Sequence, residues 1–198
     1  MRITQQASDR AGSTAARRDQ IVAATIAVLA ERGYAATSYD AICAAAGLSS
    51  KRLISYHFKT KDELLAEVLR RVTTDAAEVM RPAIEAANGA DEKLAAYIRS
   101  NLEFIAAQPD HVRAVQQIVS GGAPVPAEEA DGALARLVAL FDHGQRTGVF
   151  RKFDTVLMAV TLRAAIDAAA GRLVAGADAA HCAEELTEIF HRATRVQR

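Results

Sequence analysis

The stretch TSYDAICAAAGLSSKRLISYHFKTKDE, residues 37–63, predicts two short helices joined by a tight glycine turn. Thr37 and Ser38 are of the residue types that cap helix N-termini, and Asp40 follows Thr37 at the spacing of a capping box. The alanine-rich run after them favours a helix, and Gly47 supplies the left-handed conformation that commonly ends one. A first short helix is therefore expected before this glycine.

A second helix follows directly after the glycine. Ser49 or Ser50 can cap it, and it carries residues 51–58. Ile54 and Phe58 are four residues apart, so they share one helix face, which we expect to lie inward. Two helices joined in this way form a helix-turn-helix, whose second helix enters the major groove of DNA.

The remaining side chains of this segment suit contact with DNA. Lysine and arginine neutralise phosphates or reach guanine edges, and serine and tyrosine hydroxyls bond phosphates or bases. A helix N-terminus at Thr37 and Ser38 also favours a phosphate. The predicted DNA-contacting residues are Thr37, Ser38, Ser49, Ser50, Lys51, Arg52, Ser55, Tyr56, His57 and Lys61.

Several motifs of this region occur in a recognisable order: GYAATS (33–38), Ile42, AGLS (46–49) and YHFKTKDEL (56–64). Together they resemble the N-terminal signature of the TetR (tetracycline repressor) family, and the matches span residues 21–65. The resemblance implies a one-component transcriptional regulator. It also implies that a lysine at the place of Lys61 touches the DNA backbone; a solvated surface lysine is the alternative.

The sequence departs from the family pattern at one place. The family usually has one residue fewer between the turn glycine and the Tyr-His-Phe triplet, and the additional residue falls within residues 48–52. When the chain is aligned on the triplet, Ile54 takes the place of a buried leucine. Ser55 then takes the place of a tyrosine that contacts phosphate in the family.

The composition predicts an all-α fold. Of the 198 residues, 51% are apolar and 5% aromatic, with four prolines and no alternating Val/Ile/Thr pattern. The net charge is zero, but residues 1–60 contain eight Lys or Arg and four Asp or Glu, so a head of net +4 joins a body of net −4. This asymmetry fits DNA binding by one end of the protein.

We expect two domains and about nine helices. The DNA-binding domain comprises residues 1–60, with a flexible N-terminal arm over residues 1–13 and a first helix over residues 14–32. Arg2, Arg10, Arg17 and Arg18 are expected to reach phosphates or a minor groove, and for Arg2 and Arg10 a disordered solubilising tail is an equal alternative. Residues 61–198 form a regulatory and dimerisation domain. Its helices are expected at about 61–80, 91–108, 109–120, 127–147, 154–175 and 178–195, and Pro82 and Asn88-Gly89 mark the end or a kink of the first of them.

The predicted helix 154–175 is apolar nearly all round, so it needs partners on both sides. We expect a homodimer through the last two predicted helices, 154–175 and 178–195 (helices 8 and 9), in agreement with the family resemblance. The residues predicted to face the twofold mate are Ala159, Leu162, Ala165, Ile166, Ala169 and Leu173. Such a dimer would bind a near-palindromic operator.

The resemblance also implies a small-molecule effector bound within the helical body. Apolar walls with a few amides suit a small organic ligand. The residues predicted to line its site are Phe104, Gln108, Gln116, Phe141 and Met158. Ordinary core packing is an equal alternative for each of them.

No catalytic, cofactor-binding or metal-ligand motif is found, and we expect no enzyme activity, cofactor or metal. Arg163 and Asp167 are spaced for a salt bridge within one helix. Cys43 and Cys182 lie far apart, no secretory signal or membrane span is visible, and we expect a cytoplasmic protein.

These patterns predict a transcriptional regulator, a repressor released from operator DNA by a small molecule. One alternative is a helical ligand-binding protein or enzyme whose helix-turn-helix is purely structural. Another is an architectural DNA binder that needs no ligand, which would carry positive charge along its whole length.

Overall fold

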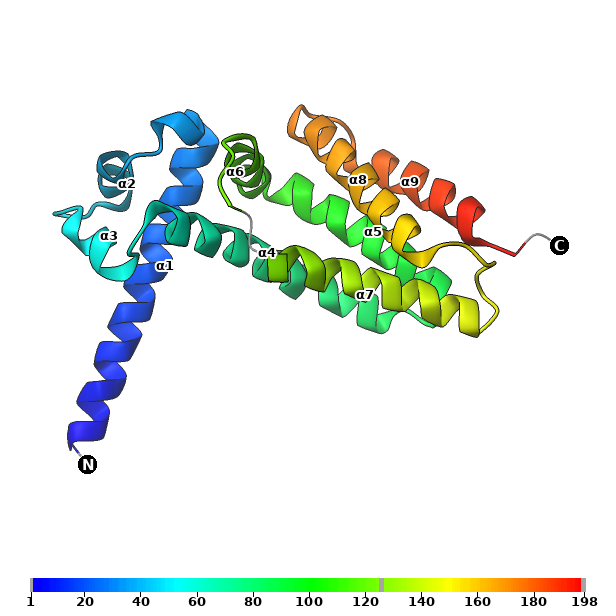
Figure 1. The fold of residues 1–198 in the computed structure, drawn as a ribbon, viewed down its shortest axis with the longest axis horizontal. Helices are drawn as coiled ribbons and strands as arrows, with labels where there is room; N and C mark the ends of the chain where they lie inside the picture. The colour runs from blue at the N-terminus through cyan, green and yellow to red at the C-terminus, as the bar shows by residue number, and fades with distance from the viewer. Residues whose placement is uncertain (1, 125–126, 197–198) are drawn as a thin grey trace. The chain divides into compact units, whose positions relative to one another are not determined.

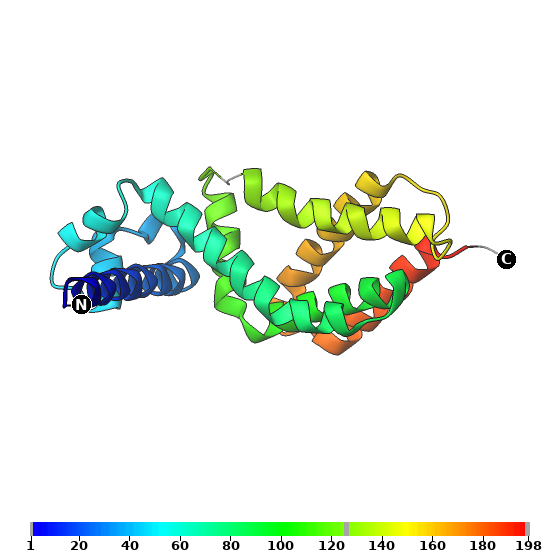
Figure 2. The ribbon, with the colours of Figure 1, turned by 90° about the horizontal axis from the view of Figure 1, so that it is seen from below.

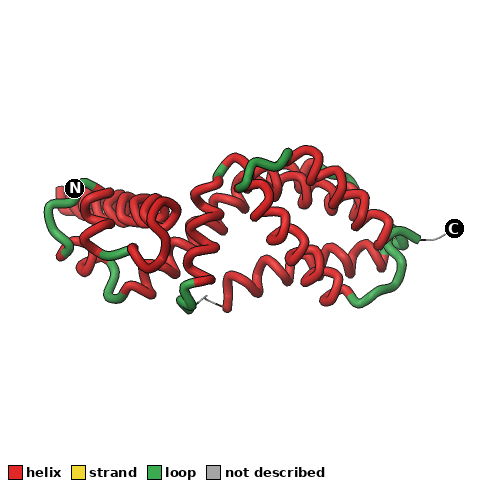
Figure 3. The backbone as a smooth tube through the Cα atoms, turned by 90° about the horizontal axis from the view of Figure 1, so that it is seen from above, coloured by secondary structure: helices red, strands yellow, loops and turns green. Residues whose placement is uncertain are grey.

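The computed structural model describes residues 2–124 and 127–196, and its regular secondary structure there is helical throughout (Figures 1 and 3). The helices are α1 (Arg2–Ala36), α2 (Tyr39–Ala46), α3 (Arg52–His57), α4 (Lys61–Ala86), α5 (Gly89–Ala107), α6 (Pro109–Ser120), α7 (Ala127–Arg146), α8 (Thr155–Val174) and α9 (Ala179–Thr194). The predicted all-α fold is confirmed.

The chain divides into two compact units, one of Met1–Val72 with Arg113–Val125 and one of Thr73–Val112 with Pro126–Arg198. The start of α4 and most of α6 therefore belong to the first unit. Over residues 2–124 and 127–196, no helix combines the length and apolarity that a membrane crossing needs.

The first unit is built on α1, against which α2 packs. Its core contains fully buried side chains from each helix of the head, including Ile21, Leu29, Ile42, Ile54 and Phe58. At Gly33 the chain takes a φ of 76°, which interrupts the helix where the sequence predicted its end. A positive φ is open to glycine because glycine has no Cβ.

The predicted arm at residues 1–13 differs from the structure, because the backbone is already helical at Arg2. The stretch contains no proline, and a glycine such as Gly12 costs a helix only about 1 kcal/mol. Met1 and the side chains of Arg2 and Arg10 lie outside the described part of the chain.

The second unit is organised around α5, which packs against α7, α8 and α9 (Figures 1 and 2). Its core combines Leu94, Ile98 and Leu102 of α5 with buried side chains of the other three helices. The expected end of the fourth helix near residue 80 is wrong, because α4 continues through Pro82 to Ala86. The residues after this proline are good helix formers, and the stop comes only at Asn88-Gly89.

The residues predicted to face a twofold mate are largely core residues of this unit. Ala159, Leu162, Ile166, Ala169 and Leu173 are buried within the chain itself, and Ala165 packs partly buried against the same cluster. This prediction is wrong because α8 has two apolar faces, and the face named in the sequence analysis packs against α5, α7 and α9.

Candidate nucleic-acid interface

Helix α2 begins and ends as the sequence predicted. The Ser38 hydroxyl oxygen accepts a hydrogen bond from the Ala41 amide at 3.2 Å. Gly47 adopts a left-handed conformation with a φ of 62°, and the Leu48 amide donates to the Cys43 carbonyl at 2.9 Å. These bonds satisfy groups that a helix end leaves without partners.

Helix α3 presents one buried and one exposed face. Ile54 and Phe58 are both 0% exposed, which confirms their predicted inward face. On the other side Tyr56 is 79% exposed, and the side chains of Lys51, Arg52 and Ser55 are also exposed. The helix therefore offers solvent a polar, basic surface anchored by apolar side chains on its back.

The segment 48–52, within which this sequence exceeds the family spacing, forms the loop before α3 and the first residue of that helix. Ser50 supplies a cap, because its hydroxyl oxygen accepts from the Arg52 amide at 3.2 Å. Ser49 is exposed, and Lys51 pairs with Asp40 of α2 at 3.3 Å between Nζ and Oδ1. Ile54 is buried, as the alignment on the Tyr-His-Phe triplet implied.

Thr37 does not offer its side chain to a phosphate. It is 2% exposed, its hydroxyl donates to the Gly33 carbonyl at 2.8 Å, and its amide donates to the Tyr34 carbonyl at 3.2 Å. The cause is the turn after Gly33, which folds Thr37 back onto the end of α1. Of the two residues predicted at this helix end, Ser38 is the exposed one.

The start of α4 lies beside the end of α1. The Thr60 hydroxyl oxygen accepts from the Glu63 amide at 3.1 Å, and the Glu63 carboxylate accepts from the Lys59 amide at 2.7 Å, so the predicted cap is present. The Lys61 ammonium lies 4.4 Å from the centroid of the Tyr34 ring, in a cation–π contact.

An arginine of α1 lies against the buried side of α3. The Arg18 Nη1 atom donates to the His57 carbonyl at 2.6 Å, and its Cζ lies 4.3 Å from the centroid of the Phe58 ring. Burial, followed by the charges of Arg18 and Arg17, lowers the pKa of His57, so this imidazole is neutral at pH 7. Sequence reasoning missed this role, because nothing local links residue 18 to residue 57.

The residues predicted to bind an effector do not gather around one described groove. The Phe141 ring packs against Phe150 and Phe153, whereas the Phe104 ring pairs with His111. Met158 is partly buried against the core of the second unit. The side chains of Gln108 and Gln116 are exposed, and their role in ligand binding stays a prediction.

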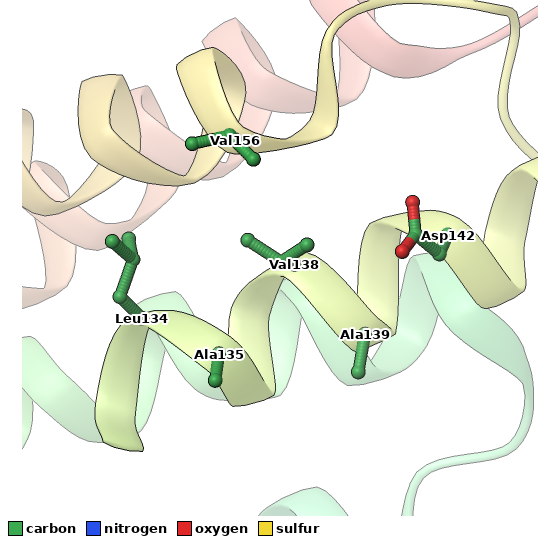
Figure 4. Close-up of a pocket in the computed structure, with 6 residues that line it drawn as sticks. All are labelled: Leu134, Ala135, Val138, Ala139, Asp142 and Val156. Atoms are coloured by element: carbon green, nitrogen blue, oxygen red, sulfur yellow. The ribbon is translucent and has the colours of Figure 1, made fainter. Parts of the chain in front are cut away.

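An open apolar groove of about 360 Å³ lies between α7 and the start of α8. Figure 4 shows Leu134 and Val138 pointing towards Val156, with Asp142 at one end. None of the five predicted effector residues lines this groove.

The salt bridge expected between Arg163 and Asp167 is present. The Arg163 Nη2 atom lies 3.6 Å from Asp167, as expected for a pair within one helix, and Arg163 also donates to the Tyr97 hydroxyl at 3.2 Å. Among the described residues, no group of three or more potential metal-ligating side chains comes together.

The comparisons with known proteins agree with this geometry. Residues 21–68 match the family model described as "Bacterial regulatory proteins, tetR family". A search of curated proteins found no match.

Several solved structures share the fold over nearly the whole chain. A TetR transcription regulator from Haloarcula marismortui is 23% identical, with 92% of this chain and 100% of that chain covered and a TM-score of 0.75. The fatty acid degradation regulator FadR from Bacillus halodurans is 22% identical, with 87% and 97% covered and a TM-score of 0.75. A protein from Saccharomonospora viridis, described as a transcriptional regulator in complex with choline, is 23% identical, with 91% and 98% covered and a TM-score of 0.73.

An all-helical body joined to a helix-turn-helix head defines a DNA-binding regulator of transcription. Residues 21–68 match the tetR family of bacterial regulatory proteins, and nearly the whole chain shares its fold with solved structures described as TetR regulators; regulators of this family are not enzymes.

Glu67 of α4 makes the stability of the head depend on pH. A hydrogen bond from Arg70 lowers the pKa of Glu67 below its ordinary value of 4.5, burial opposes this, and the charges of Arg70, Arg18 and Arg71 lower it further. A carboxyl group with a lowered pKa stabilises the folded state above the unfolded pKa, and this contribution is lost as the pH falls through the folded pKa.

Glu67→Gln is therefore expected to lower the unfolding temperature near pH 6.5, and the difference from wild type should shrink as the pH approaches about 3. Thermal unfolding over a pH series measures this difference. Glu31→Gln is the control, because Glu31 forms an exposed pair with Arg32, and such pairs contribute little. A difference that stays constant down to about pH 3 would contradict the assignment.

Proposed function

We propose that this protein is a regulator of the TetR family, that it binds a near-palindromic operator as a homodimer and that a small organic effector releases it. The observation that carries the proposal is the two-sided helix α3, which buries Ile54 and Phe58 and exposes Arg52, Ser55 and Tyr56. A short exposed helix that is held from behind is the geometry by which a helix-turn-helix reaches base edges.

The proposed DNA contacts divide into two kinds. We propose that Arg52, Ser55 and Tyr56 on α3, with Lys51 at its start, read bases, and that Ser38, Ser49 and Ser50 bond phosphates; all seven side chains are exposed. His57 is neutral and half-buried, so we assign it a packing role at the end of α3 with a hydrogen bond to DNA at most. Thr37 is removed from the set because both of its donors are used inside the head.

The outward face of α8 supports dimerisation. Val156, Leu157 and Val160 of α8 are exposed, as is Ile189 of α9, although large apolar side chains rarely cluster on a monomer surface. The groove between α7 and α8 includes Val156, so apolar surface continues along this side. We propose that this face, and not the buried one, meets the twofold mate; two recognition helices would then reach two half-sites.

Contacts within the first unit provide a route for effector control. The Tyr34 amide donates to the Gln117 side chain of α6 at 3.0 Å, and a Cβ at Gly121 would lie 2.3 Å from the Tyr34 ring. The same ring contacts Lys61. Helix α6 is thus tied to a proposed DNA-contacting lysine through one tyrosine. We propose that effector binding acts on this connection.

The chemistry of the effector is argued from the body and from related proteins. The core of the second unit consists mainly of aliphatic and aromatic side chains, and a site formed among them would suit an apolar or weakly polar ligand. Solved structures with this fold include a fatty acid degradation regulator and a transcriptional regulator in complex with choline. If an effector releases DNA, operator DNA must weaken effector binding by the same factor.

Replacement of the basic side chains around α3 tests the DNA assignment. On the tightest duplex recovered from a random pool, Lys51→Ala and Arg52→Ala are expected to cost about 1–3 kcal/mol each if they contact bases. Lys61→Ala should weaken binding to all duplexes alike and reduce the salt slope by about one, because it acts on phosphate. Fluorescence anisotropy at several salt concentrations measures both effects. Operator binding by the Lys51→Ala/Arg52→Ala double variant at wild-type strength would refute the assignment.

A charge on the exposed face of α8 tests the dimer. Leu157 is 64% exposed, so Leu157→Asp should fold normally and yet dissociate a dimer that buries this side chain. Val79→Asp is the matched control, since Val79 is an exposed valine of α4. Sedimentation at micromolar concentration should show a wild-type dimer, a Val79→Asp dimer and a Leu157→Asp monomer. A wild-type monomer, or a Leu157→Asp dimer, would contradict the proposed interface.

A further inference from the structure

The last carbonyl of each helix of the helix-turn-helix accepts a hydrogen bond from a side chain of α1. The Arg18 Nη1 atom donates to the carbonyl of His57, the last residue of α3, at 2.6 Å. The Gln20 Nε2 atom donates to the carbonyl of Ala46, the last residue of α2, at 2.7 Å. Two residues of one helix thus bond the final carbonyls of two others.

These carbonyls need partners, because the last carbonyls of a helix have none within it. Helix α3 has only six residues and would not persist alone in water. A cation at its C-terminal end also interacts favourably with the negative end of the helix dipole. Arg18 therefore stabilises α3 at the end where the chain leaves it.

Arg18 is itself held on two sides. Its guanidinium lies over the Phe58 ring, and its Nη2 atom is 3.7 Å from the Glu67 carboxylate on α4. Only 34% of the Arg18 side chain is exposed. This one group therefore fixes the end of α3 against both α1 and α4.

Gln20 is oriented by its own neighbour. The Arg17 Nη1 atom donates to the Gln20 Oε1 atom at 2.7 Å, which leaves the Nε2 atom to face the Ala46 carbonyl. The turn at Gly47 follows Ala46 directly, so this bond holds α1 against the start of the turn.

We infer that Arg18 and Gln20 are positioning residues that set the pose of α3 relative to α2, and hence the fit of the recognition helix to its operator. The inference rests on the proposed DNA-binding function. Attraction to phosphate depends on charge, whereas base readout depends on the exact placement of side chains. Loss of these two bonds should therefore reduce operator binding more than binding to unrelated DNA.

The alternative role for Arg18 is direct contact with phosphate, and a charge-preserving variant separates the two roles. Arg18→Lys keeps the cation but not the planar group that stacks on Phe58 while it bonds His57. Gln20→Met keeps the length of the side chain and removes its donor. Arg32→Lys is the matched control, because Arg32 lies on the same helix and pairs only with the adjacent Glu31 in the described contacts.

The experiment measures the affinity of each variant for the selected operator and for a scrambled duplex, at several salt concentrations. Arg18→Lys and Gln20→Met should each weaken operator binding about three- to tenfold. Binding to scrambled DNA and the salt slope should stay at wild-type values, and Arg32→Lys should change nothing. Wild-type binding to scrambled DNA also shows that a variant is folded, and Gln20→Met tests the inference independently of Arg18.

Three results would overturn the inference. Operator affinities of both variants equal to wild type would show that the bonds do not set the pose. Equal losses on operator and scrambled duplex, with a salt slope lower by about one for an Arg18→Ala variant, would show direct phosphate contact. If the wild-type protein does not distinguish the two duplexes, the proposed function itself fails, and the inference fails with it.

Discussion

The six-residue helix α3 depends on the burial of Ile54 and Phe58 beneath it. So short a helix forms too few internal hydrogen bonds to offset its nucleation cost. Burial of a large apolar side chain contributes about 1.5–3 kcal/mol, so these two contacts decide whether the helix exists. Fully buried Leu64, Leu65 and Val68 of α4 belong to the same compact unit. Because burial of Ile54 and Phe58 stabilises α3, the residues on its exposed face are not needed to keep it folded.

Arg18 and Glu67 connect this apolar layer to charge. The guanidinium packs on the Phe58 ring and bonds the end of α3, while the carboxylate of α4 faces it. Burial, followed by the charge of Arg18, lowers the pKa of His57, so the charges that we propose for DNA lie on Lys51, Arg52 and Lys61. In the head, Arg18 thus has a structural role, whereas Lys51, Arg52 and Lys61 are the cations proposed to contact DNA.

Local signals predicted most of the head and the fold class. Ser38, Gly47 and Thr60 act as caps because capping depends on a few adjacent residues, and these positions were predicted. Thr37 was placed wrongly because the turn after Gly33 buries it. Contacts such as Tyr34 with Gln117 join residues 83 positions apart, and no local pattern encodes them.

The body was harder to predict for a different physical reason. The apolar stripe of an amphipathic helix predicts which face is buried. Helix α8 is apolar on both sides, so its sequence does not predict which face packs against its own chain. The structure buries Ala159, Leu162 and Ile166 and exposes Leu157 and Val160. The sequence also could not distinguish core packing from ligand contact for the apolar candidate effector residues, because apolar side chains at helical spacing occur in both cores and ligand cavities.

The central claim is that α3 reads the major groove, and chemical protection of the operator tests it most directly. Dimethyl sulfate methylates guanine N7 in the major groove and adenine N3 in the minor groove, so it distinguishes the two. The account predicts that the bound protein protects guanine N7 in two symmetric patches about one helical turn or a small multiple apart, and leaves adenine N3 within those patches reactive. Protection confined to adenine N3, or an operator whose guanines all stay reactive, would contradict it.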